Sequence, residues 1–293
     1  MSQITSAARY VKELDVNDFK ILKVCISSLK HHEVLTRNEI VDYSKLHGNI
    51  ADYAISNLLE RKILAKTSNF KGYKMLSLGL DVYALKILVE KNIINAVGRP
   101  IGIGKESDVY EAFTQNENES TVALKFYRIG RTSFTDTKRK RSLENKNPHS
   151  WLLLNVEAAK KEYDILSSLE NSGVSIAKPI YRSLHCLILD KIDGMRLSDI
   201  PVLYDPEKIY RKIIEQIKAC YKHGLINCDT SEYNIMINSK GDIVLIDWVQ
   251  AVRTDHPNAS YYLERDVKNV TRFFNRKFKL DHDHLLEIKK TLA

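Results

Sequence analysis

Three polar residues in the second half of the chain stand out, because the apolar pattern around them does not require them. Asp229 and Asn234 precede one run of β-branched residues, and Asp247 follows a second run. The two runs flank the polar turn 238–242 and predict a β-hairpin. Asp-x-x-x-x-Asn, a hairpin and then Asp is a spacing suited to phosphoryl transfer: Asp229 would face the attacking group, and Asn234 and Asp247 would hold Mg²⁺ against phosphates. A turn-capping role explains Asp229 alone but not the set of three.

A glycine-rich segment lies more than a hundred residues earlier. Gly102 and Gly104 stand between two strand-like stretches, and a further apolar strand ends at Lys125. Glycines let backbone N–H groups approach phosphates, and a lysine at the end of the next strand suits the α- and β-phosphates. A Rossmann loop is excluded, because strand-like sequence follows the glycines instead of a helix. The predicted nucleotide-binding residues of this loop are Gly102, Gly104, Lys105, Glu106, Ser107 and Val109.

The elements between these two segments predict the rest of a nucleotide site. A helix is expected over residues 150–170, and its Glu162, or alternatively Glu157, would hold Lys125 in place. Two strands follow, and the backbone near Asp190 and Ile192 lies where a two-lobed kinase hydrogen-bonds adenine. A helix over residues 205–223 then leads to the catalytic stretch.

The first 90 residues read as three helices followed by a β-hairpin, the order of a winged-helix domain. Its third helix would present Asp52, Tyr53, Asn57, Glu60 and Arg61, and its wing Lys66, Lys71 and Lys74. Basic wing residues suit phosphate contacts, whereas the acidic residues of the helix oppose a DNA backbone. Contact with RNA, with DNA or with protein stays open. The fold class predicted is α+β, with a winged helix at 1–90, a kinase-like N-lobe at 91–192 and a reduced C-lobe at 193–293.

Charge and composition restrict the class of protein. The 293 residues carry a formal net charge of +8, which favours polyanionic partners. The surplus concentrates in residues 128–148, a polar, basic run of the kind that is usually solvated. No apolar run reaches the length of a membrane span, and the N-terminus lacks a secretory pattern. The four scattered cysteines are typical of reduced structural thiols, so a cytoplasmic protein is expected.

Several motifs, in order, carry a resemblance to a known family. They are residues 102–110, Gly130 to Phe134, Asp229 to Asn234, Ile246 to Trp248 and Leu263 to Val267. Together they resemble the RIO atypical serine/threonine protein kinases, and the N-terminal winged helix points to the Rio-two type in its compact, archaeal-like form. The resemblance implies ATP between two lobes, Lys125 on the phosphates, catalytic Asp229 and the metal ligands Asn234 and Asp247. It further implies a phosphorylated Asp247 and a role with rRNA and proteins in small ribosomal subunit maturation.

The chain departs from that family pattern around the catalytic aspartate. Asn227 and Cys228 stand where the family usually has His-Gly, and Thr230 stands where an apolar residue is common. Only 46 residues follow Asp247, too few for an ordinary substrate-docking lobe, so peptide recognition is in doubt. The interpretations left open are a protein kinase with a protein acceptor or autophosphorylation, an ATP-controlled assembly factor that binds nucleic acid, and a winged-helix regulator.

Overall fold

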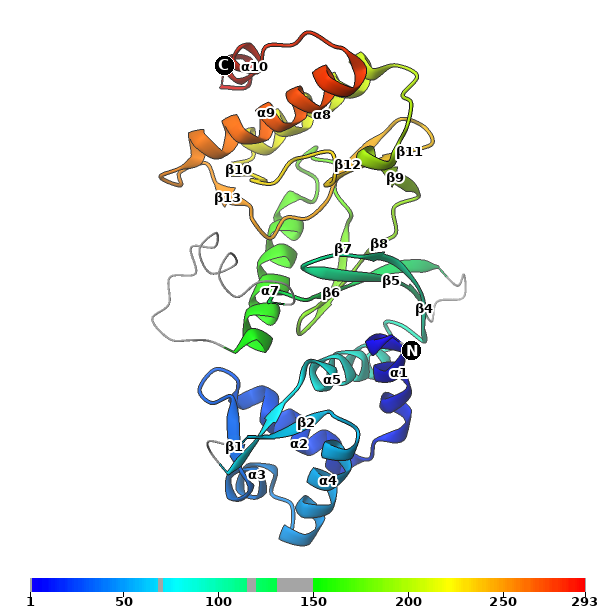
Figure 1. Cartoon of the computed structure of the whole chain (residues 1–293), viewed down its shortest axis with the longest axis vertical. Helices are drawn as coiled ribbons and strands as arrows, with labels where there is room; N and C mark the ends of the chain where they lie inside the picture. The colour runs from blue at the N-terminus through cyan, green and yellow to red at the C-terminus, as the bar shows by residue number, and fades with distance from the viewer. Residues whose placement is uncertain (1, 68–70, 115–119, 131–149, 293) are drawn as a thin grey trace. The chain divides into compact units, whose positions relative to one another are not determined.

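The computed structural model describes residues 2–67, 71–114, 120–130 and 150–292 (Figure 1). The chain forms two compact units, one of Met1–Lys160 with Tyr181–Ile188 and the other of Lys161–Ile180 with Leu189–Ala293. The domain borders expected at residues 90 and 192 stay predictions.

The N-terminal part of the first unit is a winged helix, as predicted. Its elements in order are α1 (Gln3–Glu13), α2 (Val16–Ser28), β1 (Val34–Thr36), α3 (Arg37–Ser44), α4 (Gly48–Glu60), β2 (Leu64–Thr67) and β3 (Gly72–Met75). Capping boxes begin α2 at Asp15 and α3 at Thr36, because each cap side chain accepts a backbone N–H that the helix leaves unpaired. The three strands pair antiparallel in the order β1-β3-β2. Helix α1 was not predicted, and Gly48 begins α4 instead of only interrupting a helix.

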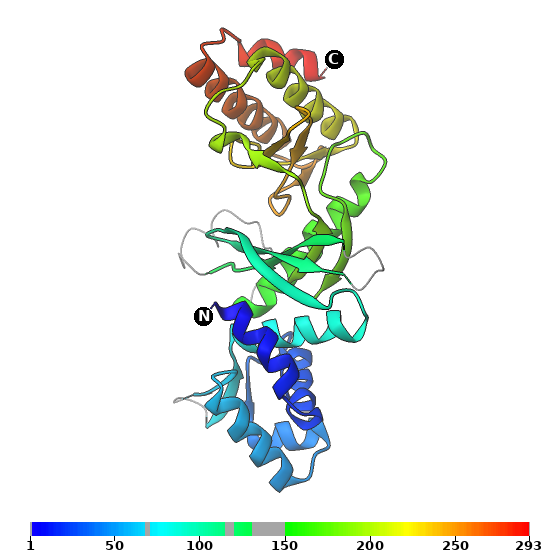
Figure 2. The same cartoon turned by 90° about the vertical axis from the view of Figure 1, so that its right-hand side faces the viewer.

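Helix α5 (Ser77–Glu90) joins the winged helix to the next part of the same unit, and α1 lies along it (Figure 2). The buried apolar residues of these helices belong to one hydrophobic core, which continues into the following sheet through Tyr110, Leu124 and Phe126. A continuous core resists separation of its parts, since parting them would expose apolar surface to water. The winged helix and this sheet therefore form one packed body.

That sheet has five strands in the order β4-β5-β6-β8-β7. The strands are β4 (Ala96–Ile103), β5 (Ser107–Phe113), β6 (Thr121–Tyr127), β7 (Pro179–Ser183) and β8 (Cys186–Asp190). Strands β4, β5 and β6 pair antiparallel, as expected for the glycine-rich hairpin and the strand that carries Lys125. Helix α7 (Trp151–Leu169) lies between β6 and β7 in the chain and agrees with the predicted long helix.

The second unit positions the catalytic stretch between two long helices. Its elements are β9 (Gly194–Arg196), η1 (Leu197–Asp199), α8 (Pro206–Lys222), β10 (Leu225–Ile226), β11 (Ile235–Asn238), β12 (Ile243–Leu245), β13 (Val252–Arg253), α9 (Ala259–Phe278) and α10 (His284–Leu292). Helices α8 and α9 pack through buried aromatic contacts, including Tyr210 with Phe274 and a 3.0 Å hydrogen bond between Tyr210 and Thr271. Strand β11 lies between β12 and β9, and β10 pairs with β13. Among the described residues, no helix has the length and hydropathy to span a membrane.

Candidate active site

The glycine-rich loop is a tight turn between β4 and β5. The Gly104 N–H donates to the Ser107 carbonyl at 2.8 Å, and Gly102 lies opposite Val109 in the hairpin register. A Cβ at Gly104 would come within 3.2 Å of the Ser107 carbonyl oxygen, so a side chain there would press on the turn. Lys105 and Glu106 form the exposed tip. The predicted loop is therefore present, with its backbone accessible for a phosphate group.

Lys125 lies on β6, directly across the sheet from Val109. Its side chain is buried to 7% exposure, and its ammonium lies 5.1 Å from the centroid of the Tyr127 ring. A buried lysine is rare unless its charge is compensated, so its burial distinguishes Lys125 from the exposed lysines of the chain. The sheet register places Lys125 beside the strand that leaves the glycine-rich loop.

The predicted adenine contacts are narrowed by one backbone hydrogen bond. The Asp190 N–H donates to the Lys178 carbonyl at 2.9 Å, so it is already used within the fold. The adenine contact at this segment stays a prediction, now without the Asp190 N–H.

Two strand pairs hold the catalytic stretch at its ends. Strand β10 ends just before Asn227 and pairs with β13, so the chain from 227 to 251 forms a closed loop. Within it, β11 and β12 form the predicted hairpin, and the Ile246 N–H donates to the Asn234 carbonyl at 2.9 Å. This bond extends the hairpin by one residue on each side. Asn234 consequently lies beside the chain that enters Asp247.

The structure brings Asp229 and Asn234 into direct contact. The Asn234 side-chain amide donates to the Asp229 carboxylate at 2.8 Å and to the Asp229 carbonyl at 2.9 Å. Asp229 itself is exposed, whereas Cys228 and Thr230 on either side are buried. Because the amide nitrogen is used in this way, the Asn234 amide oxygen is the group left to serve as a metal ligand.

Asn227 connects the Asp229 turn to the Asp247 segment. Its amide oxygen accepts the Asp229 N–H at 3.1 Å, and its amide nitrogen donates to the Asp247 carbonyl at 3.1 Å. Asp247 has a φ of +63°, a left-handed conformation that costs free energy in a residue other than glycine and is often found at functional sites. Sequence reasoning noted Asn227 only as a departure from the family pattern. It is the side chain that holds the two acidic segments together.

Asp266 on α9 also holds the turn that contains Asp229. Its carboxylate accepts the Cys228 N–H at 2.8 Å and the Thr230 N–H at 3.2 Å, and it also accepts the Thr230 hydroxyl. Burial raises the pKa of Asp266 to about 7 against these hydrogen bonds. Its sequence signal was weak, because it lies within the 263–267 motif but distant in sequence from Asp229.

Cys228 is a structural residue in this turn. Its φ is +65°, which explains why glycine suits the position in related sequences. Burial raises the pKa of the Cys228 thiol to about 12, so the thiolate nucleophile is absent at neutral pH. All four cysteines are buried and free, in agreement with the prediction of structural thiols.

Glu162 and Glu157 on α7 are the two acids that could hold Lys125, and Glu162 is the buried one of the two. Glu162 is 1% exposed, and its carboxylate accepts the Trp248 N–H at 3.3 Å, next to Asp247. Glu157 is exposed to solvent. Glu162 therefore supports the metal-site segment within the second unit, while its pairing with Lys125 stays a prediction.

The interpretation of Arg128 as part of a solvated basic run is wrong. Arg128 is 7% exposed and pairs with Asp81 and Asp108 in the first unit. Two buried carboxylates far apart in the sequence bind it, which a local charge pattern does not reveal. Residues 131–149 of the basic run, including most of the Gly130–Phe134 motif, lie outside the described residues.

Few side chains at the catalytic stretch could bind a metal ion, and those that could would bind it through oxygen atoms. In the part of the chain that the structure describes, no group of three or more His, Cys, Asp or Glu residues could hold a metal ion. Mg²⁺ usually binds one or two protein oxygens and completes its shell with waters and substrate phosphates. An Asn234 amide oxygen with the Asp247 carboxylate fits that pattern, so these residues suit magnesium and not a structural zinc.

Comparisons with known proteins agree with this geometry. The RIO domain family matches residues 108–285, and the Rio2 N-terminal family matches residues 11–91. The serine/threonine-protein kinase rio2 of Schizosaccharomyces pombe is 34% identical over 280 residues, covering 94% of this chain and 80% of that protein. The RIO-type serine/threonine-protein kinase Rio2 of Methanocaldococcus jannaschii is 36% identical over 269 residues, covering 89% of this chain and 97% of that protein.

A solved structure supports the same relation. The Rio2 kinase–ADP/Mg²⁺–phosphoaspartate complex of Chaetomium thermophilum aligns with a TM-score of 0.83 at 30% identity, covering 97% of this chain and 88% of that one. The chain therefore belongs to the RIO family of atypical serine/threonine kinases, in its Rio2 type.

Proposed function

We propose that the chain transfers the γ-phosphoryl group of Mg-ATP. The observation that carries the proposal is the connected set Asp229, Asn234, Asn227 and Asp247, in which one carboxylate is held by the side chain that would also offer a metal ligand. In phosphoryl transfer the protein chiefly positions groups and neutralises charge, so a rigid set of acids and amides is the expected catalytic apparatus.

Each residue has a distinct task in this proposal. Asp229 orients the attacking hydroxyl or water and accepts its proton. Lys125 and the amides of the glycine-rich loop neutralise the phosphates of the nucleotide. Asn234 and Asp247 hold Mg²⁺, which supplies positive charge next to the phosphate oxygens. Asn227 and Glu162 keep the Asp247 segment in place through its carbonyl and the neighbouring Trp248 N–H.

Asp247 can also be the acceptor. The related structure from Chaetomium thermophilum is described as a phosphoaspartate complex, and Asp247 is the residue of this chain whose phosphorylation the family resemblance implies. A carboxylate oxygen of Asp247 would attack the γ-phosphorus while the bond to the β–γ bridging oxygen breaks, releasing ADP. Water would then cleave the acyl phosphate, giving net ATP hydrolysis. This route fits a switch better than a signalling kinase, because it requires no protein substrate.

Turnover and mass analysis test the proposal. The wild-type chain incubated with Mg-ATP is expected to release phosphate and to carry a phosphate that hydroxylamine removes, as an acyl phosphate requires. Asp229→Asn and Asp247→Asn should each abolish turnover, whereas Asp255→Asn, an exposed aspartate of the same unit, should leave it unchanged. Wild-type turnover in either catalytic variant would overturn the proposal. A phosphate stable to hydroxylamine would assign a serine or threonine acceptor instead.

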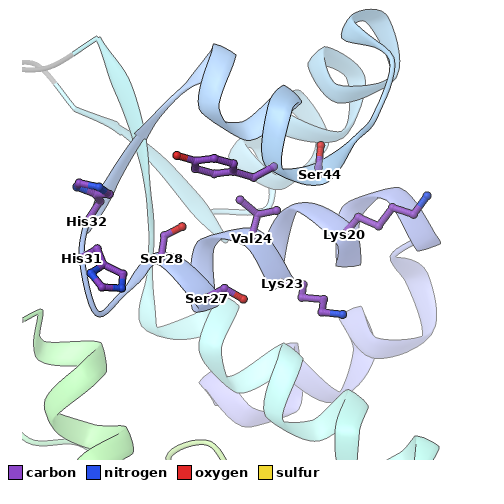
Figure 3. A pocket seen from close by; sticks show the side chains of 9 residues that line it. Lys20, Lys23, Val24, Ser27, Ser28, His31, His32 and Ser44 are labelled. Atoms are coloured by element: carbon purple, nitrogen blue, oxygen red, sulfur yellow. The ribbon is translucent and has the colours of Figure 1, made fainter.

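We further propose that the chain acts in the cytoplasm and binds RNA of the small ribosomal subunit. The winged helix is the part of the chain that contacts this RNA. A hollow of about 500 Å³ lies beside α2 and α3 (Figure 3). Lys20 and Lys23 lie toward one end of it and His31 and His32 toward the other, with Ser28 between them. Within the described part of the chain, neither lysine forms an ion pair. Their charges are therefore available to phosphates.

Helix α4, the winged-helix element expected to contact bases, is less suited to nucleic acid. Asp52 on α4 accepts two hydrogen bonds from Arg37, at 2.6 and 2.7 Å, and Asn57 donates to the buried Asp18. Side chains committed within the fold are not free to read bases. The aromatic Tyr43 beside the basic hollow is 57% exposed and offers a face on which an unpaired base can stack. These features favour single-stranded RNA over duplex DNA.

Binding measurements with defined RNA test this partner. The full chain should bind a single-stranded ribosomal RNA fragment more tightly than duplex DNA of equal length, and Lys20→Glu with Lys23→Glu should weaken it at least tenfold. The variant Lys12→Glu with Lys62→Glu is the matched control, with the same change of charge at two exposed lysines of the domain outside the hollow and the wing. Equal loss in both pairs would indicate general electrostatics, and preference for duplex DNA would favour a regulator instead.

A further inference from the structure

A cluster of buried charges connects the winged helix to the sheet that carries the glycine-rich loop. The Arg128 guanidinium donates to Asp81 at 2.7 and 3.1 Å and to Asp108 at 3.0 Å. His185 lies 2.8 Å from the same Asp81. All four side chains are less than 10% exposed. They belong to one compact unit, so the contacts are internal to a single body.

Arg128 holds the glycine-rich loop at two points. Its backbone N–H donates to the carbonyl of Glu106, at the loop tip, at 2.6 Å. Its side chain binds Asp108, the second residue of the strand that leaves the loop. Ser107 lies between these two attachment points. The position of the backbone that would face the phosphates is therefore determined in part by where the Arg128 side chain is anchored.

The anchor is Asp81 on α5, the helix that packs against α1 of the winged-helix domain. Asp81 is fully buried and also accepts a hydrogen bond from Gln3 of α1. Burial would raise the pKa of Asp81, but the hydrogen bond from His185 and the charge of Arg128 keep it below its usual value, so the carboxylate is charged. Because a carboxylate only accepts, the His185 proton lies on the nitrogen that faces Asp81. Burial lowers the pKa of His185, which is neutral.

A guanidinium is suited to this position because its planar fork can bind two carboxylates at once. Lysine keeps the charge but has a single nitrogen, which cannot reproduce bonds to both Asp81 and Asp108. Removing one partner from a buried charge set leaves the other uncompensated, so the remaining groups must rearrange. The loop tip at Glu106, which the Arg128 N–H holds, is exposed and can adjust, whereas Asp81 is fully buried in the hydrophobic core and cannot.

We infer that Arg128 is a positioning residue that couples the winged helix to the nucleotide-binding loop, through Asp81 on one side and Asp108 with the Glu106 carbonyl on the other. Nucleotide binding then depends on Asp81, a residue of α5 that touches no nucleotide. By linkage, nucleotide binding must in turn stabilise α5. The inference rests on the nucleotide site proposed above, with Mg-ADP as its ligand.

Hydrogen exchange in the wild-type chain is the first test, and it requires no variant to fold. Mg-ADP should slow exchange in peptides of the glycine-rich loop and also in α5, residues 77–90. In Arg128→Lys the loop peptides should still respond, while the α5 response is lost. Loop protection with no change at α5 in the wild type would overturn the coupling. No ADP binding by the wild type would instead overturn the nucleotide site itself.

The second test compares two buried aspartates of the same domain. Asp81→Asn should weaken Mg-ADP binding about tenfold, measured by calorimetry on the full chain. Asp18→Asn is the control: Asp18 is also buried and bonds Asn57 within the winged helix, but it has no contact with Arg128. It should lower the melting temperature without changing ADP affinity. Equal ADP affinity in Asp81→Asn and wild type, or equal loss in both variants, would refute the positioning role.

Discussion

Asn227→Ala tests most directly how the catalytic turn is held. The side chain is 4% exposed and makes three hydrogen bonds: it accepts from the Asp229 N–H and the Thr230 hydroxyl and donates to the Asp247 carbonyl. The Thr230 hydroxyl keeps a partner in Asp266 at 3.2 Å, so the Asp229 N–H and the Asp247 carbonyl are the two groups that lose their bond to Asn227. An unsatisfied buried polar group costs about 1–3 kcal/mol, which gives a loss of about 3 kcal/mol in the free energy of unfolding.

The effect on catalysis should exceed the effect on stability. Once the link is broken, Asp229 and Asp247 can move independently, and small misplacements of reacting groups reduce rates strongly. We expect kcat for ATP hydrolysis to fall at least tenfold under conditions where the variant is fully folded. Phosphate release at saturating Mg-ATP measures kcat, and urea unfolding measures the stability change.

Two further variants show whether the link itself matters. Asn227→Asp keeps an acceptor for the Asp229 N–H but turns an oxygen toward the Asp247 carbonyl, so it should lose activity as well. Asn238→Ala is the matched control, since the Asn238 amide also makes three hydrogen bonds, accepting from two backbone N–H groups and donating to Asp242, but at the hairpin turn away from the site. If kcat of Asn227→Ala lies within threefold of that control, the reasoning about the link is refuted.

Three other predictions concern single features of the site and of the partner surface. The pKa of Asp266 is raised to about 7 in the folded state, compared with about 3.9 in the unfolded chain. The stability that its protonated form contributes is therefore fully present below pH 4 and is lost as the pH rises toward 7. The free energy of unfolding should fall by about 1.4 kcal/mol for each pH unit in that range. Urea unfolding against pH should show this decline in the wild type but not in Asp266→Asn, and parallel curves would contradict it. Glu162→Gln should lower ATP turnover at least tenfold, whereas the exposed Glu157→Gln should leave it unchanged; the reverse order would assign the role to Glu157. Replacing Lys20 and Lys23 with Gln should reduce the slope of log affinity against log salt for single-stranded RNA by about 1.4, and an unchanged slope would exclude both lysines from phosphate contact.

Local signals in the sequence determined most of the elements and the central residue set. The Thr36–Glu39 capping box and the apolar runs on either side of turn 238–242 each act over a few residues, so each could be interpreted without the fold. The spacing of Asp229, Asn234 and Asp247 is also a local signal that can be interpreted without the fold. A hairpin alone brings Asn234 beside the segment of Asp247.

Only the tertiary structure decided which side chains hold these residues. Asp266 reaches the catalytic turn from α9, and Arg128 is bound by Asp81 from α5, across separations of 38 and 47 residues. The sequence around Arg128 predicted a solvated basic run, because charge in a local window carries no information about a buried carboxylate elsewhere in the chain. Burial is a property of the packed fold, and it changed both the partner and the role of Arg128.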